Sequence, residues 1–228
     1  MTNTLPEIAS TLFDGPGERS KSILCYNIYE TFFQPFRNKE ISLFEVGVFN
    51  GESTKIFAKY FCNAQIVGID HDLRAIDLNG YRNINLFQGD QSSYEFMAGV
   101  ADEYFGNGID IVIDDASHIG ILSKRTFEIL FPRLKSGGIY IVEDWGTGYW
   151  TNWHDGGLYE IYETRPFHKG EFVKRIPSHD YGMVGFIKHV VDLVGMSDNR
   201  PTSQSEQKQS SPIKGMHIFP GTVVIEKA

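Results

Sequence analysis

The chain has 228 residues, of which 41% are hydrophobic, so it can bury one substantial core. Its formal net charge of -8 argues against nucleic acid or an anionic membrane as a general partner. The two cysteines, Cys25 and Cys62, lack a metal-type spacing and predict free thiols in a reducing, cytoplasmic setting. We expect no signal peptide, and no apolar stretch approaches the roughly 20 residues that span a bilayer.

Apolar runs alternate with helical patterns along the first two thirds of the chain. A helical N-terminal segment is expected within residues 1–40. The expected strands cover residues 41–48, 65–70, 84–90, 109–115 and 138–144. The expected helices between them cover residues 52–61, 72–79, 93–105 and 122–134, the second being the shortest. This alternation predicts a Rossmann-like α/β fold, a mostly parallel twisted sheet with helices on both faces.

The pattern changes after Asp144. Residues 145–180 are rich in aromatic side chains and glycine, and we interpret them as a lid or substrate region. Helical spacing returns at 181–195, and the polar run 197–212 predicts a mobile surface loop. Two β-rich runs in 214–227 predict a C-terminal hairpin that adds an antiparallel pair to the sheet. We expect residues 1–228 to form a single domain.

Every expected strand ends in an acid or carries one near its end. The acids are Glu45, Asp70, Asp90, the pair Asp114 and Asp115, and the pair Glu143 and Asp144. Ligands of open parallel sheets bind at the carboxyl ends of the strands, near the point where strand order reverses. The sequence therefore predicts a ring of carboxylates around one binding site.

The segment "FEVGVFNGEST" (44–54) places Gly47 and Gly51 in a strand-to-helix turn. Glycines there let the backbone approach a ligand, although two glycines alone fit a purely structural turn equally well. A dinucleotide fingerprint would need a glycine where Phe49 stands, so the segment does not favour a nicotinamide cofactor.

The order Glu45, Gly47, Gly51 resembles the first motif of class I S-adenosylmethionine-dependent methyltransferases. The resemblance implies that these three residues belong to the cofactor site. It also implies that Asp70 binds the ribose hydroxyls. The residues that would lie near the adenine are Asp90 and Gln91. Carboxylates suit this cofactor because they accept hydroxyl protons and attract the cationic sulfonium.

A second group of acids follows two expected strands. Asp115, Glu143 and Asp144 offer three hard oxygen donors without a thiolate, a set that suits Mg²⁺ or Mn²⁺. Acids at such positions can instead cap the next helix, so the pattern alone leaves both interpretations open. A histidine after a strand is also more often structural than catalytic, but His118 lies between these acids in the chain.

The pattern "IDDASHI…TFEILFPRLKSGGIYIVEDW" resembles the Mg²⁺-dependent sugar O-methyltransferases of macrolide and related antibiotic biosynthesis, the mycinamicin type. The resemblance covers about residues 25–152 and resumes at "GMHIFPGTVVIEK". It implies that Asp115, Glu143 and Asp144 bind the metal ion and that His118 is the general base. It also implies that Asp114 lies beside the methionyl end of the cofactor. This chain lacks the "G-T-D-K-G" type of segment that family members often carry before the first motif.

The cluster "WGTGYWTNWH" holds Trp145, Tyr149, Trp150 and Trp153. Aromatic rings stack on sugars, which favours a substrate wall formed by Trp145, Tyr149 and Trp150. They also build cores and interfaces, and that alternative stays open.

These observations predict an S-adenosylmethionine-dependent, Mg²⁺-assisted O-methyltransferase that acts on a hydroxyl of a sugar or glycosylated natural product. Its partner would be a small hydroxylated acceptor, and a homo-oligomer is left open. Three alternatives remain: an Fe(II) hydroxylase-like enzyme, for which a second histidine ligand is lacking; a nicotinamide dehydrogenase, disfavoured by Phe49; and a non-catalytic cofactor-binding or assembly subunit.

Overall fold

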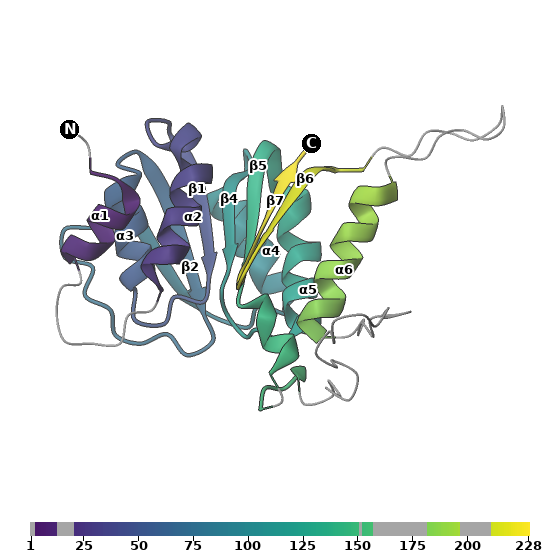
Figure 1. Cartoon of the computed structure of the whole chain (residues 1–228). Helices are drawn as coiled ribbons and strands as arrows, with labels where there is room; N and C mark the ends of the chain where they lie inside the picture. The colour runs from purple at the N-terminus through teal and green to yellow at the C-terminus, as the bar shows by residue number, and fades with distance from the viewer. Residues whose placement is uncertain (1–2, 13–20, 151, 157–181, 197–210) are drawn as a thin grey trace, which may run out of the picture.

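The computed structural model describes residues 3–12, 21–150, 152–156, 182–196 and 211–228 (Figure 1). The strands are β1 (Ile41–Val46), β2 (Ala64–Asp70), β3 (Ile84–Gln88), β4 (Ile109–Asp114), β5 (Leu134–Glu143), β6 (Ile213–Phe219) and β7 (Thr222–Lys227). The α-helices are α1 (Leu5–Leu12), α2 (Ile23–Phe33), α3 (Glu52–Tyr60), α4 (Tyr94–Tyr104), α5 (Gly120–Leu130) and α6 (Gly182–Gly195). Most of the predicted lid and of the predicted mobile loop lies outside the described residues.

The seven strands form one sheet in the order β3-β2-β1-β4-β5-β7-β6. Strands β1 to β5 run parallel, while β7 runs antiparallel to β5 and β6 antiparallel to β7. The predicted α/β fold and its C-terminal hairpin are confirmed. Strand order reverses between β1 and β4, and this switch point is where such sheets open a crevice for ligands.

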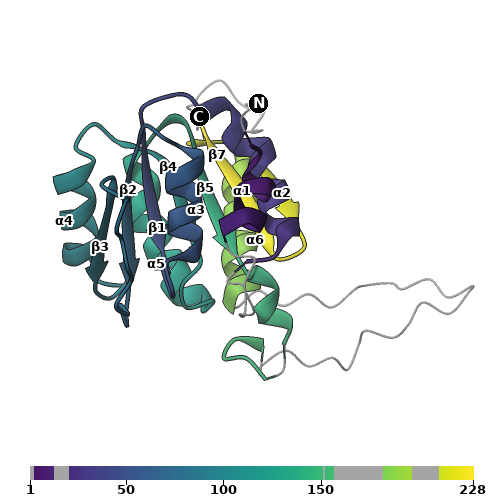
Figure 2. The ribbon, with the colours of Figure 1, turned by 90° about the vertical axis from the view of Figure 1, so that its left-hand side faces the viewer.

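Helices cover both faces of the sheet: α1 and α3 lie to one side of it and α5 and α6 to the other in Figure 1, and Figure 2 views the molecule from the side of α1 and α3. Helices α1, α2 and α3 pack on one face, where Ile111 and Ile113 of β4 point, whereas α4, α5 and α6 pack on the other, where Val112 points. Both faces are therefore buried, which explains the nearly continuous apolar runs of the central strands. None of the described helices is long and apolar enough to cross a membrane.

The predicted helix at residues 72–79 is wrong, because this segment has no regular structure. Leu73, Ile76 and Leu78 are half-buried. Ile76 lies against the start of α3, where a Cβ on Gly51 would come within 2.7 Å of its side chain. The apolar spacing thus reflects a loop lying on the molecule. Asp77 stabilises a local turn by accepting a hydrogen bond from the amide of Asn79 at 2.9 Å.

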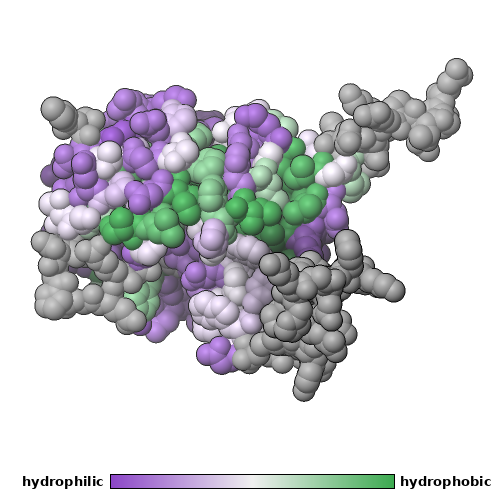
Figure 3. All heavy atoms as spheres, in the orientation of Figure 1, coloured by the Kyte–Doolittle hydropathy of each residue, from purple (hydrophilic) through white to green (hydrophobic). Residues whose placement is uncertain are grey.

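The α1–α2 side of the molecule carries hydrophobic side chains across its middle (Figure 3). Leu24 of α2 is 62% exposed and Ile218 of β6 is 51% exposed. The ring of Phe32 lies 4.9 Å from that of His217 and 6.1 Å from that of Phe219, so α2 packs beside β6 without covering all of it.

The contact between α5 and α6 gives a stability test. A Cβ on Gly120 would lie 1.9 Å from the carbonyl carbon of Gly182, so Gly120→Ala should lower the free energy of unfolding by about 1–3 kcal/mol or more. Gly99 of α4 is the matched control, because nothing lies within 4 Å of its added Cβ. Gly99→Ala should raise stability by about 0.5–1 kcal/mol. Urea denaturation of both variants checks this, and equal effects would contradict the packing.

Candidate functional site

A cavity of about 950 Å³ opens at the carboxyl ends of the parallel strands, beside the switch point. Its walls come from the β1–α3 turn, the end of β2, the loop after β3, the β4–α5 loop and the residue after β5. The lining residues are Val46, Gly47, Val48, Phe49, Ser53, Ile69, Asp70, His71, Gly89, Asp90, Gln91, Ser92, Asp115, Ala116, Ser117, His118, Leu122, Asp144 and Trp153.

The glycine turn after β1 depends on Gly47. Its φ is +93°, and a Cβ there would lie 2.1 Å from the carbonyl oxygen of Asp115. Only glycine therefore lets this turn pass against the β4–α5 loop. Gly51, with φ +77°, is the N-cap residue of α3 and shapes the same turn without lining the cavity.

Glu45 does not reach the cavity. Its carboxylate is fully buried and accepts hydrogen bonds from the hydroxyls of Ser53 at 2.6 Å and Thr54 at 2.5 Å. Burial raises the pKa of Glu45. That Glu45 belongs to the cofactor site stays a prediction; in this geometry its carboxylate fixes the first turn of α3.

Asp70 lines the cavity at the end of β2, as predicted for a ribose-binding acid. One carboxylate oxygen accepts the amides of Val48 at 2.9 Å and Phe49 at 2.8 Å, and the other accepts the amide of Asp72 at 3.0 Å. These bonds fix the carboxylate against the glycine turn, and Oδ1, which accepts the single amide of Asp72, keeps a further acceptor site for a ligand.

Asp90 and Gln91 also line the cavity, after β3. Asp90 is exposed, and hydrogen bonds from Ser92 hold its pKa below the usual range. Gln91 is buried and donates to the hydroxyl of Thr126 at 3.0 Å, which fixes its amide between this loop and α5.

Asp114 and Asp115 point to opposite faces of the sheet. Asp115 lines the cavity, whereas Asp114 is buried on the α4–α5 side, does not line it, and lies 3.5 Å from the amide nitrogen of Gln91. The expected position of Asp114 beside the cofactor stays a prediction, and the described lining of the cavity does not include this residue. Side chains alternate along a strand, so adjacent acids cannot share a face. Burial raises the pKa of Asp114 to about 7.

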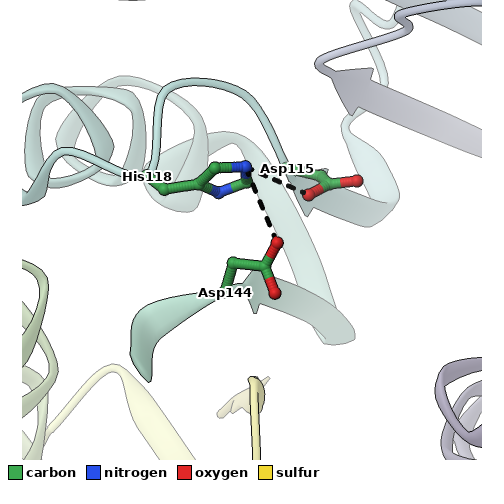
Figure 4. A group of neighbouring side chains, drawn as sticks. All are labelled: Asp115, His118 and Asp144. Carbon is green, nitrogen blue, oxygen red and sulfur yellow. Dashed lines mark ion pairs between the residues drawn. The ribbon is translucent and has the colours of Figure 1, made fainter. Parts of the chain in front are cut away.

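Asp115, His118 and Asp144 converge at one side of the cavity (Figure 4). His118 Nε2 lies 3.9 Å from Asp115 Oδ1 and 3.7 Å from Asp144 Oδ2, and one donor atom from each residue lies within 4.8 Å of the others. These gaps are too long for direct hydrogen bonds and match the separations of atoms around a shared ion. Burial lowers the pKa of His118, and this outweighs the opposing effect of Asp144.

The backbone of His118 is held in an uncommon conformation. Its φ is +51°, and its carbonyl oxygen accepts hydrogen bonds from Trp153 Nε1 at 3.0 Å and from the hydroxyl of Thr147 at 3.3 Å. Asp144, with φ +52°, is likewise fixed through its amide, which donates to the carbonyl of Gly221 at 2.6 Å. Strain of this kind concentrates at functional sites.

Glu143 lies apart from this group. It is buried on the α2 side and accepts hydrogen bonds from the Lys21 ammonium at 2.6 Å and from the Tyr29 hydroxyl. The Lys21 ammonium also bonds to Asp115. That Glu143 binds a metal ion stays a prediction, and in this geometry its partner is Lys21. Sequence reasoning missed Lys21; its spacing of four and eight residues from Cys25 and Tyr29 was the available signal.

Among the described residues of the aromatic cluster, Trp153 lines the cavity. Trp145 packs against the core and donates from its indole nitrogen to the carbonyl of Phe219 at 2.9 Å. Tyr149 and Trp150 are 41% and 53% exposed and do not line the cavity. The described part of the chain therefore does not place the predicted wall of Trp145, Tyr149 and Trp150 at the site.

The sequence is similar to curated sugar O-methyltransferases. It is 29% identical over 209 residues to mycinamicin VI 2''-O-methyltransferase of Micromonospora griseorubida, covering 87% of this chain and 47% of that protein. It is 30% identical over 213 residues to 8-demethyl-8-alpha-L-rhamnosyl tetracenomycin-C 2'-O-methyltransferase of Streptomyces olivaceus, covering 87% and 49%. The chain thus spans about half the length of these relatives. No family model matches it.

The fold is similar to that of solved methyltransferases. The MycE methyltransferase of the mycinamycin biosynthetic pathway, solved in complex with Mg and SAH, matches with a TM-score of 0.76 and 25% identity. The match covers 100% of this chain and 55% of that one. The resemblance to class I and mycinamicin-type methyltransferases, inferred above from the sequence motifs, is confirmed for fold and sequence.

The position of Asp114 predicts a pH-dependent stability. Its pKa is about 7 in the folded protein and about 3.9 in the unfolded chain, so the folded state binds the extra proton between these values. The contribution of Asp114 to the free energy of unfolding is fully present below about pH 4 and is lost as the pH rises through about 7. Asp114→Asn removes the titration. In urea denaturation, the free energy of unfolding of the variant should rise relative to that of the wild type between pH 5 and pH 8. A difference between the two proteins that does not change with pH would refute the raised pKa of Asp114.

Proposed function

We propose that this chain, which has the class I methyltransferase fold and the sequence pattern of sugar O-methyltransferases, transfers a methyl group from S-adenosylmethionine to a sugar hydroxyl with the help of a divalent metal ion. The observation that carries the proposal is the single cavity that joins two sets of residues. Asp70 and the Gly47 turn line one part of it, at the ends of β1 and β2, and Asp115, His118 and Asp144 line the neighbouring part, at the ends of β4 and β5.

The first side fits the cofactor. Gly47 keeps the turn free of side-chain atoms, Asp70 offers fixed carboxylate oxygens for ribose hydroxyls, and Asp90 and Gln91 lie at the next strand end. The cofactor would supply a methyl group on its sulfonium and leave as S-adenosylhomocysteine. The net acidic character of the cavity suits that positive charge.

The second side fits a metal ion. Asp115 and Asp144 supply oxygen donors, the ligands that Mg²⁺ prefers, and 55% exposure of the Asp144 side chain leaves room for water or substrate oxygens. A bound Mg²⁺ would lower the pKa of a coordinated hydroxyl. Glu143 remains a further candidate ligand, by resemblance to the family.

His118 is the proposed general base. As an O–CH₃ bond forms and the S–CH₃ bond breaks, the hydroxyl proton passes to Nε2, the nitrogen that faces the two aspartates. Its lowered pKa keeps the imidazole neutral, and therefore able to accept a proton, at neutral pH. Trp153 and Thr147 hold the backbone of His118 so that the ring stays in this position.

The proposed acceptor is a glycosylated small molecule. Several relatives are named for methylating sugars of macrolides or tetracenomycin, and MycE was solved in complex with mycinamycin VI. The acidic walls of the cavity favour a neutral or cationic hydroxylated acceptor over a polyanion.

Calorimetric binding of S-adenosylhomocysteine tests the proposal. We expect the wild type to bind it, Asp70→Ala to weaken binding by about 10- to 100-fold through lost charged hydrogen bonds, and the exposed Asp77→Ala to leave binding unchanged. Asp115→Ala should keep the cofactor and lose Mg²⁺. A wild type that binds no S-adenosylhomocysteine would sink the methyltransferase assignment.

His118→Asn tests the role of the histidine, since asparagine tolerates the positive φ found there. With glycosylated macrolide as acceptor, the production of S-adenosylhomocysteine should fall by about 10²–10⁴-fold, the usual contribution of a general base. Binding of Mn²⁺ should change by less than threefold. A loss of Mn²⁺ binding in this variant would instead make His118 a metal ligand.

A further inference from the structure

Lys21 is a buried cation that contacts Asp115 of the candidate metal site at the carboxylate oxygen that does not face His118. Its side chain is 1% exposed, and its ammonium bonds to Asp115 Oδ2 and, at 2.6 Å, to Glu143 Oε1. Asp115 uses its other oxygen, Oδ1, to face His118. One oxygen of the Asp115 carboxylate thus binds the lysine, and the other faces the cavity.

The N-terminal end of α2 builds this contact. Lys21 lies directly before the N-cap residue of α2, Cys25 and Tyr29 lie four residues apart on one side of the helix, and all three contact Glu143. Ser22 fixes where the helix begins, because its hydroxyl accepts the amide of Cys25 at 3.2 Å. The start of α2 therefore fixes the backbone beside Lys21, two carboxylates hold its ammonium, and its side chain is almost fully buried.

The sheet explains why a cation is needed there. Asp115 and Glu143 continue the strand positions of Ile113 and Ile141, which face the α1–α3 layer, and Glu45 lies on the same face of β1. Neighbouring buried carboxylates repel one another, and the charge of Lys21 offsets this repulsion.

We propose that Lys21 is a positioning residue of the metal site: its ammonium ties Asp115 to Glu143 and so presents Asp115 Oδ1 to a divalent ion. The inference rests on the proposed metal-binding function. Outer partners that hold a ligating carboxylate typically contribute 10- to 100-fold to metal affinity. Without Lys21, Asp115 is free to turn its carboxylate, and Glu143 beside it lacks a counter-charge.

The test is Mn²⁺ affinity, measured by electron paramagnetic resonance and calorimetry on the full chain. We expect Lys21→Met to weaken Mn²⁺ binding by about 10- to 100-fold. Lys135→Met is the matched control, because Lys135 pairs with Asp110 at 2.7 Å, outside the cavity. It should leave the affinity within threefold. If Lys21→Met does not fold, Lys21→Gln carries the test, since its amide keeps one hydrogen bond and most of the volume.

The outcomes separate the two proposals. A wild type that binds no Mn²⁺ would overturn the metal site and the role of Lys21 with it. Wild-type binding that persists within threefold in the Lys21 variants would overturn only the positioning role, whatever their melting temperature in EDTA, because a purely structural lysine changes stability alone. Tighter binding in the variants would also overturn it, by showing that the ammonium repels the ion.

Discussion

The alternation of side chains along the parallel strands is the constraint on which the site depends. Asp114 and Asp115 are adjacent in the chain, yet one is buried toward α4 and α5 and the other faces the cavity. The same alternation directs Glu143 toward α2. Asp144 follows β5 with a positive φ, which turns the chain there, and its side chain lines the cavity. The sheet therefore divides the acids into buried, structural groups and groups that can meet a ligand.

Burying that many carboxylates requires specific compensation, and each has a different one. Glu45 accepts hydrogen bonds from two hydroxyls of α3, and Glu143 accepts them from Lys21 and Tyr29. Burial raises the pKa of Asp114, which favours its uncharged form. A buried charge without a partner costs several kcal/mol, so these arrangements are a condition for placing the remaining acids at the cavity.

The sequence predicted the sheet and most of its helices, because the periodicity of strands and helices is a local pattern. It also predicted four residues that line the cavity, Asp70, Asp115, His118 and Asp144, because they lie at or just after the ends of strands. It did not predict the loop at 72–79, where half-buried side chains imitate helical spacing. Lys21 was missed because its partners lie about 90 and 120 residues away in the chain, in contacts that only the packing of α2 on the sheet creates. The four-residue spacing of Lys21, Cys25 and Tyr29 is a local pattern, but it does not identify these distant carboxylates.

The cofactor side and the metal side are joined through the backbone. The Asp115 amide donates to the carbonyl of Val46 at 2.8 Å, and the Asp115 carbonyl lies where a side chain on Gly47 would be. The turn that would face the cofactor and the loop that would hold the metal ion therefore cannot move independently by more than the play in these contacts. In methyl transfer the reacting atoms must be aligned to within fractions of an ångström. In the described part of the chain, the backbone contacts between the two loops would support this alignment, and Lys21, just before α2, holds the second loop through the Asp115 carboxylate.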